Sequence, residues 1–249
     1  MPKQAPKISV VIPSYNEAEF IHIILESLAD QDFKDFEVIV SDAQSKDGID
    51  KMVKNFASSL DIKLIEAPPK GPAFGRNEGA EQARGEWLLF LDADVRLHSD
   101  NFVSTLLAQT EKNNWGTSSA KLVTRDATTV EKIGTWIDYH YIKLLSRTKH
   151  PVAPGYCILT RTKLFRENGG FDESIHFGED YDYVIRVGRS GFGFVEAVEY
   201  SVDLRRFRNE GFLWVLKTIW NEIYRFTHGF RPKHSNIKYE FGKHKKRGD

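Results

Sequence analysis

The stretch "GRNEGAEQARGEWLLFLDAD" (residues 75–94) runs from a helical segment into the most apolar strand of the chain. Gly85 ends the helix expected over residues 75–85, and the run from Trp87 to Leu91 predicts the strand. Two acids, Asp92 and Asp94, follow this strand one residue apart. Ligands of parallel α/β sheets lie beyond the carboxyl ends of the strands, so we expect both acids at a binding edge.

The same alternation of strand and helix extends outward from this stretch. Strands separated by helices of this length predict right-handed crossovers and an α/β fold, a Rossmann-like, mostly parallel sheet with helices on both faces. Before residue 75 the patterns indicate strands over residues 7–13, 36–43 and 62–67 and helices over residues 17–31 and 47–58. After residue 94 they indicate helices over residues 101–112, 129–147 and 179–189 and strands over residues 115–124 and 156–160.

Composition excludes several classes of protein. The 249 residues contain 35 basic and 35 acidic side chains, so no global field recruits nucleic acid. Cys157 is the single cysteine, which excludes an internal disulfide and fits a reducing compartment. The start "MPKQAPK" has no apolar core of a signal peptide, and no long apolar run predicts a membrane span. We therefore expect one cytoplasmic domain.

The acid pair after the strand of residues 87–91 has several interpretations. It is compatible with a turn that caps the next helix. A calcium loop is excluded, because Arg96 and Leu97 stand where that pattern needs an oxygen ligand and a glycine. A phosphatase with an aspartate nucleophile carries such a pair after its first strand, whereas this pair follows the fourth. A magnesium or manganese site for a nucleotide diphosphate explains the placement best, since hard cations take oxygen ligands and leave positions for phosphates.

Four segments in series carry a resemblance to a known family. They are "ISVVIPSYNE", "VIVSDAQSKDG", "GRNEGAEQARGEWLLFLDAD" and "GGFDESIHFGED". Together they resemble a family 2 glycosyltransferase of the type A fold, over residues 7–190. The resemblance implies inverting transfer of a sugar from a nucleotide-diphosphate sugar to a glycan or lipid-linked acceptor. It also divides the single domain into a nucleotide-sugar-binding half (residues 7–125), an acceptor half (126–200) and a C-terminal helix with a basic tail (201–249).

Two other functions stay open beside the transferase. A sugar nucleotidyltransferase shares this fold type and the metal, but it needs a glycine-rich basic loop after the first strand, where this chain has "PSYNE". A non-catalytic nucleotide-binding module is the second alternative, although a module has no need of the full set of acids. Processive members of the family carry a Gln-x-x-Arg-Trp motif that is missing here, so one transfer per encounter is expected.

The resemblance assigns roles at the donor site. Asp94 is expected to bind Mg²⁺ or Mn²⁺ directly, and Asp92 to accept hydrogen bonds from the ribose or from the waters of the metal. Arg76, which we expect to begin a helix, either reaches the diphosphate or orients these acids; a surface arginine is the alternative. Arg205 and Arg206, in "DLRRFRNEGF", either hold a phosphate or simply face solvent.

The nucleoside is expected against the loop after the first strand. Tyr15 follows Pro13 there, and the resemblance implies that its ring stacks on the base. Glu17 either accepts from the ribose or base, or stands as an acid in the first turn of a helix. Asp42 matches the first acid of the second segment, but Ala43 replaces the acid that reads uracil in many members. This departure argues against uracil recognition. A UDP-sugar is still the first choice because such donors are frequent in the family, and a GDP-sugar stays open.

The segment "GED" at residues 178–180 is expected to supply the general base. Without the resemblance, Glu179 and Asp180 read as acids that favourably meet the dipole of the helix they open. With it, Asp180 is the base that takes the proton of the acceptor hydroxyl, and Glu179 supports it. Asp182 is expected to point to a different side of the helix.

The end of the chain carries an amphipathic pattern. "GFLWVLKTIWNEIYRF" (residues 211–226) combines aromatic and basic residues and precedes a tail that includes Lys243, Lys245 and Lys246. One expectation is a helix that contacts anionic lipid at the inner face of a membrane; the other is a helix packed on the domain. The tail by itself reads as a solvated end.

Overall fold

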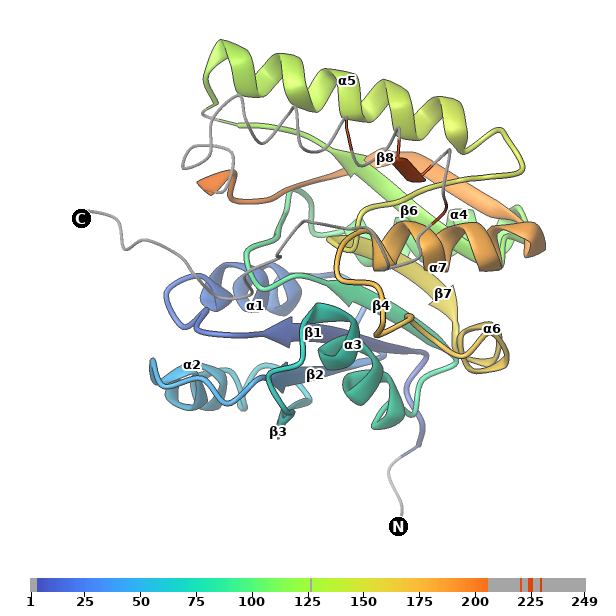
Figure 1. Ribbon diagram of the computed structural model, residues 1–249. Coiled ribbons are helices and arrows are strands. Elements are labelled where there is room, and N and C mark those ends of the chain that lie inside the picture. Colours follow the sequence, from blue (N-terminus) through green and yellow to red (C-terminus); the bar gives the residue numbers. More distant parts are fainter. Residues whose placement is uncertain (1–3, 126, 206–219, 221–223, 226–228, 230–249) are drawn as a thin grey trace.

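The computed structural model describes residues 4–125, 127–205, 220, 224, 225 and 229 (Figure 1). These residues form one 8-stranded sheet in the order β3-β2-β1-β4-β7-β6-β8-β5. The strands are β1 (Ile8–Ser14), β2 (Phe36–Asp42), β3 (Ile62–Glu66), β4 (Trp87–Leu91), β5 (Arg96–Leu97), β6 (Thr117–Leu122), β7 (Cys157–Arg161) and β8 (Phe192–Ser201). Strands β1 to β4 are mutually parallel where they pair, and β6 is parallel to β8. Strand β7 runs antiparallel to β4 and β6, and β5 runs antiparallel to β8. The sheet is therefore mixed, with most strand pairs parallel.

Helices cover both faces of this sheet, as the alternation of elements predicts. The helices are α1 (Ile21–Ala29), α2 (Ile49–Asn55), α3 (Pro72–Glu81), α4 (Phe102–Lys112), α5 (Thr129–Leu145), α6 (Thr162–Glu167) and α7 (Glu179–Val187), with a 3-10 turn at Gly188–Ser190. Successive side chains of a strand point to opposite faces. Ile8, Val10 and Ile12 of β1 accordingly join a core with α1, α2 and α4, whereas Val11 joins a second core with α3, α6 and α7.

Three features of the fold differ from the sequence-based expectation. Helix α3 begins at Pro72, after Gly71 with φ of 108°, because proline favours the first position of a helix. Arg76 therefore lies inside α3, and the expectation that it begins the helix was wrong. Strand β8 was not expected; it pairs with β6 and so belongs to the centre of the second half. The short elements β5 and α6 were not expected either.

The expectations for the end of the chain fall largely outside the described residues. Arg206, the basic tail and all of residues 211–226 except Trp220, Tyr224 and Arg225 lie outside them. Within the part that the structure describes, no helix combines the length and the apolar character that a bilayer crossing requires.

Candidate active site

The carboxyl ends of β1, β2 and β4 meet at one edge of the sheet. Because the three strands are parallel neighbours, the loops that follow them converge at that edge. These loops carry Tyr15 and Glu17 after β1 and the acids Asp92 and Asp94 after β4. Helix α7, with Glu179 and Asp180 in its first turn, comes to the same place from the second half.

Arg76 joins the two halves of the site. Its Nη2 donates to Oδ1 of Asp92 at 2.8 Å, and its Nη1 donates to Oε1 of Glu179 at 3.0 Å. The residue is only 3% exposed. Although burial lowers the pKa of Arg76, the carboxylates of Asp92, Glu179 and Asp180 raise it above the ordinary value, so the guanidinium stays charged. Of its two expected roles, the geometry favours orientation of the acids.

Glycines create the space that Arg76 occupies. A Cβ atom on Gly155 would lie 2.3 Å from Arg76 Nη2, and one on Gly79 would lie 2.4 Å from a methyl group of Val11. Gly79 thus lets α3 lie directly on β1, and Gly155 leaves room for the guanidinium. Pro13 of β1 is buried and lies close to α3. A Cβ on Gly75 would lie 3.2 Å from the Pro13 side chain, so Gly75 allows this close approach.

Asp180 is held by two backbone N–H groups. Gly155 donates to Oδ2 at 2.6 Å, and Tyr181 donates to Oδ1 at 2.8 Å. The pKa of Asp180 is raised to about 7, chiefly by burial and then by the charge of Glu179, while Arg76 and the two N–H donors lower it. A carboxylate with a pKa near the working pH is suited to general-base catalysis. Asp182 binds Arg186 at 2.7 Å, so it faces a different side of α7, as expected.

A second ionic cluster surrounds Asp94. Arg205 Nη2 lies 2.6 Å from Oε2 of Glu17 and 3.4 Å from Oδ2 of Asp94. The guanidinium also stacks on the ring of Phe20, 3.9 Å from its centroid. Arg205 Nη1 is buried and has no hydrogen-bond partner within the described part of the chain. Arg205 thus links the segment after β8 to the loops after β1 and β4.

The charge around Asp94 fits a divalent cation. The pKa of Asp94 is raised to about 7, chiefly by burial; Arg205 lowers it, while the charges of Glu17, Asp92 and Asp203 add to the rise. Several carboxylates thus share one guanidinium, and a hard cation with oxygen ligands would relieve this repulsion. Among the described residues no group of three or more His, Cys, Asp or Glu side chains is placed to enclose a metal. A cation held here therefore needs further oxygen ligands, which a diphosphate supplies.

Asp42 organises the loop after β2. It is 5% exposed, and its carboxylate accepts from the N–H of Ser45 at 2.8 Å and from the Ser45 hydroxyl at 2.5 Å. Ser45 in turn accepts from the N–H of Asn16 at 2.7 Å, and Asp47 accepts from the N–H of Ala18 at 2.8 Å. The loop after β2 is therefore fastened to the loop that carries Tyr15. Ser45 and Asp47 were not singled out from the sequence, although both stand in the quoted segment "SDAQSKDG".

A pocket of about 450 Å³ opens beside Tyr15. Its wall also includes the first turn of α3 and the turn that precedes α7, through Lys70, Gly71, Pro72, Ala73, Glu173, Ile175 and His176, together with Pro69. The volume lies within the range of small-molecule sites. Lys70 and His176 were not expected here. The position of "PKGP" shortly after the third expected strand was the available signal, since loops at that edge bind ligands.

Asn77 positions the turn before α7. Its Nδ2 donates to the carbonyl of Phe171 at 2.9 Å, and its Oδ1 accepts from the N–H of Phe171 at 3.0 Å. It follows Arg76 in the quoted segment "GRNEG", but its partner is far away in sequence and no local pattern reveals it.

Comparison with known proteins agrees with this geometry. A family model described as Glycosyl transferase family 2 matches residues 9–169. The chain belongs to this family. The matched range spans β1 to β7 and both acids after β4, and it ends before α7.

Curated relatives of this family 2 chain include two bacterial glycosyltransferases. Over 105 residues it is 40% identical to the GalNAc(5)-diNAcBac-PP-undecaprenol beta-1,3-glucosyltransferase of Campylobacter jejuni, which covers 41% of this chain and 34% of that protein. Over 201 residues it is 29% identical to the amylovoran biosynthesis glycosyltransferase AmsB of Erwinia amylovora, with 75% of this chain and 65% of that protein covered. The chain thus spans about a third of the length of the Campylobacter relative.

Solved structures share the fold. Residues 1–349 of Staphylococcus aureus TarS superpose with a TM-score of 0.65 and 25% identity, over 88% of this chain and 65% of that one. The mannosyltransferase PcManGT of Pyrobaculum calidifontis, solved with GDP-Man and Mn²⁺, gives a TM-score of 0.70 at 21% identity, over 91% of this chain and 64% of that one. At 21% identity, the similarity to PcManGT shows a shared fold and nothing further.

Proposed function

We propose that this family 2 chain transfers a sugar, with inversion, from a nucleotide-diphosphate sugar to a hydroxyl group of an acceptor. The proposal includes a divalent metal, Mg²⁺ or Mn²⁺, and one transfer per encounter, because "DLRRFRNEGF" stands in place of the motif of processive members. The names of the Campylobacter and Erwinia relatives refer to a lipid-linked acceptor and to amylovoran biosynthesis. They support a role in the synthesis of a cell-surface glycan or glycolipid.

The environment of Asp180 is the observation that carries this proposal. Inversion requires in-line attack by the acceptor hydroxyl, and a carboxylate must take its proton as the new bond forms. The pKa of Asp180 is raised to about 7, and the Gly155 N–H fixes its orientation. Arg76 binds both Glu179, the neighbour of Asp180, and Asp92. This bridge fixes the position of the base relative to the acids after β4.

The donor half follows from the groups at the same edge. Asp94 and Asp92 would hold the metal, which when bound would neutralise charge on the diphosphate leaving group. The buried Nη1 of Arg205, which has no hydrogen-bond partner among the described residues, is a donor for a phosphate oxygen. The pocket beside Tyr15 offers space and an aromatic ring for the base. We favour a UDP-sugar, and Ala43 keeps a GDP-sugar open.

A panel of UDP- and GDP-sugars tests the proposal. Each donor is incubated with the protein and Mn²⁺, and the released nucleotide is measured. We expect a free nucleoside diphosphate from at least one donor, even when water is the acceptor. Pyrophosphate formed from a sugar phosphate and a nucleoside triphosphate would instead identify a nucleotidyltransferase. Donor binding without any turnover, with glycan and lipid-linked acceptors present, would identify a binding module.

A further inference from the structure

Helix α5 is amphipathic in the reverse sense of an ordinary surface helix. Such a helix normally turns its apolar stripe to the core and its polar face to water. On α5, the large apolar side chains that are more than half exposed are Val130, Ile133, Trp136, Ile137 and Leu144. Their spacings of three, four and seven residues place them on one side of the helix. In Figure 1, α5 lies along the outer edge of the molecule, over β6 and β8.

The side of α5 that faces the sheet is largely polar. The Tyr139 hydroxyl donates to Glu196 of β8, and Lys143 Nζ lies 2.8 Å from the same carboxylate. The Tyr139 ring also contacts Phe194 of β8, with 5.9 Å between the ring centroids, and Ile142 is 2% exposed. These contacts fix which side of α5 is turned inward. The apolar stripe is therefore the outer surface of a helix whose orientation is already determined.

The charges around the stripe have one sign. In residues 127–150 the exposed charged side chains are Lys132, Arg147 and Lys149, all cationic. Neither acid of this segment is fully exposed: Glu131 is 3% exposed and accepts from the Thr128 backbone at 2.6 Å in the helix cap, and Asp138 is half-buried. An exposed apolar stripe with a tryptophan and a cationic border is complementary to an anionic lipid surface.

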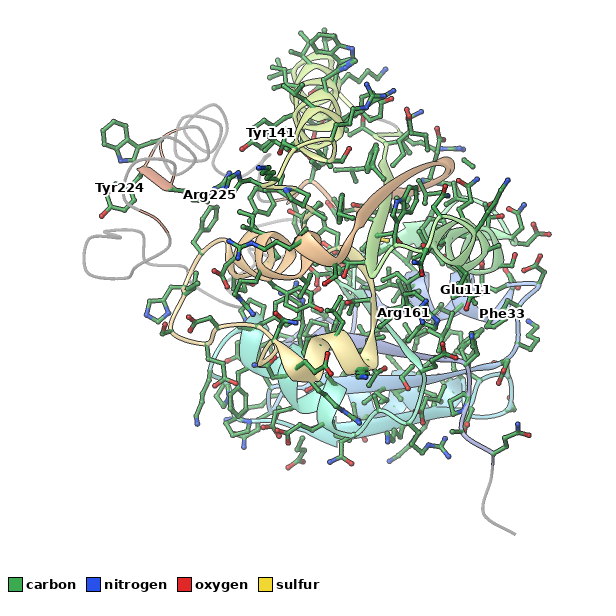
Figure 2. All side chains as sticks on the ribbon, turned by 90° about the vertical axis from the view of Figure 1, so that its right-hand side faces the viewer. Phe33, Glu111, Tyr141, Arg161, Tyr224 and Arg225 are labelled. Carbon is green, nitrogen blue, oxygen red and sulfur yellow. The ribbon has the colours of Figure 1, made fainter. Side chains whose placement is uncertain are left out.

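A described part of the C-terminal segment lies beside the same helix. Arg225 Nη2 donates to the Tyr141 hydroxyl of α5 at 2.9 Å, and Figure 2 shows Tyr141, Arg225 and Tyr224 on the same side of the molecule. Trp220, which belongs to this segment, is 66% exposed. An aromatic ring that is apolar with one polar atom suits a membrane interface. The segment that contacts α5 through Arg225 thus also carries an exposed tryptophan.

We propose that the outer face of α5 docks on an anionic membrane surface, with the helix lying in the plane of the interface. A second copy of the chain is the less suitable occupant. In a two-fold contact the same patch meets itself, so the cations that border the stripe would approach one another. Anionic headgroups bind these cations, while the apolar side chains enter the acyl boundary. Membrane docking is a property separate from the proposed sugar transfer, and it does not depend on that reaction.

The docking face is connected to the catalytic base. After α5 ends at Leu145, the chain passes through residues 146–150, which are largely exposed, and the buried residues 151–154 to Gly155. Gly155 donates its N–H to Asp180 and abuts Arg76. Along the chain, α5 is thus followed by the segment that contacts the groups proposed to act on an acceptor.

Vesicle flotation with the full chain tests the docking. Vesicles of phosphatidylglycerol and phosphatidylcholine in equal parts are compared with vesicles of phosphatidylcholine alone. We expect the protein to float with the anionic vesicles, and the double variant Ile133→Ser, Ile137→Ser to lose at least about tenfold in binding. Lys132→Glu should weaken binding by a few-fold, and the matched exchange Lys112→Glu on α4 should leave it unchanged. Because these side chains are exposed, thermal unfolding of all variants should match the wild type.

Several results would overturn the proposal. One is failure of the intact chain to float with either vesicle. Another is wild-type binding by the serine double variant together with loss of binding by Trp220→Ser, which would place the contact in the C-terminal segment. A dimer in sedimentation equilibrium that Ile137→Ser dissociates would assign the stripe to a second copy.

Discussion

Replacing Asp94 by asparagine should stabilise the fold while removing a metal ligand. The pKa of Asp94 rises from 3.8 to about 7, chiefly through burial. One pH unit corresponds to about 1.4 kcal/mol, so keeping this carboxylate charged in the folded state costs up to about 4 kcal/mol above pH 7. The side chain is 17% exposed, and the variant loses its contact with Arg205, so we expect a net gain of about 1–3 kcal/mol.

The sign of the pH dependence follows from the raised pKa. Below about pH 4 the carboxyl is protonated in both the folded and the unfolded chain, so the charge costs nothing there. The cost grows as the pH rises from 3.8 to about 7 and is constant above. The advantage of Asp94→Asn should therefore be nearly absent near about pH 4 and complete at about pH 8.

Urea unfolding without metal, at both pH values, measures this difference. Asp100→Asn, an exposed change of the same chemistry, is the control and should shift the free energy of unfolding by less than about 0.5 kcal/mol. Added Mn²⁺ should stabilise the wild type and not Asp94→Asn. Equal or lower stability of Asp94→Asn at about pH 8 would refute the argument that Asp94 is held in an unfavourable charged state.

Three further predictions concern the same cluster. Arg76→Gln should lower the free energy of unfolding by about 3–5 kcal/mol, because it leaves Glu179 buried and unpaired; the partly exposed control Arg161→Gln should cost less than about 1 kcal/mol in the same urea assay, and similar values for both would contradict the role of Arg76. Arg205→Gln should tighten Mn²⁺ binding without donor by roughly tenfold in calorimetry, because the guanidinium no longer competes for Asp94; unchanged affinity would show that it does not. Nucleotide release should vanish with a chelator and return with Mn²⁺ or Mg²⁺ in the wild type but not in Asp94→Ala; full activity in excess chelator would exclude a metal role.

The first half of the fold was predictable because its signals are local. Strands β1 to β4 are short apolar runs, and Gly, Pro and acid residues separate them from the helices. The sequence therefore predicted the sheet, its binding edge and the acids at that edge. Strand β8 was missed because Glu196 and Glu199 interrupt its apolar residues. Its register on β6 also shifts after Ala120. Only pairing with β6 and β5 makes this segment a strand.

The long-range contacts of the site were not predictable in the same way. Arg76 and Glu179 are 103 positions apart, and Arg205 and Glu17 are 188 apart. A single sequence shows each residue type but not its partner. Gly155 is a similar case: it read as part of a loop, whereas its function depends on the guanidinium that lies against it and the carboxylate that accepts from it. The roles of individual site residues remain predictions.

The most direct test of the account is the effect of Asp180→Asn on turnover and on donor binding, measured on the same protein. With the donor that the nucleotide-release panel identifies, we expect turnover to fall by about a hundredfold or more while donor affinity stays within about twofold, since a base acts only in the transition state. Asp182→Asn should have much less effect, and wild-type turnover should rise with pH up to the pKa of Asp180, about 7, and level off above it. Near-normal turnover of Asp180→Asn would contradict the assignment of the base and with it the proposed reaction geometry.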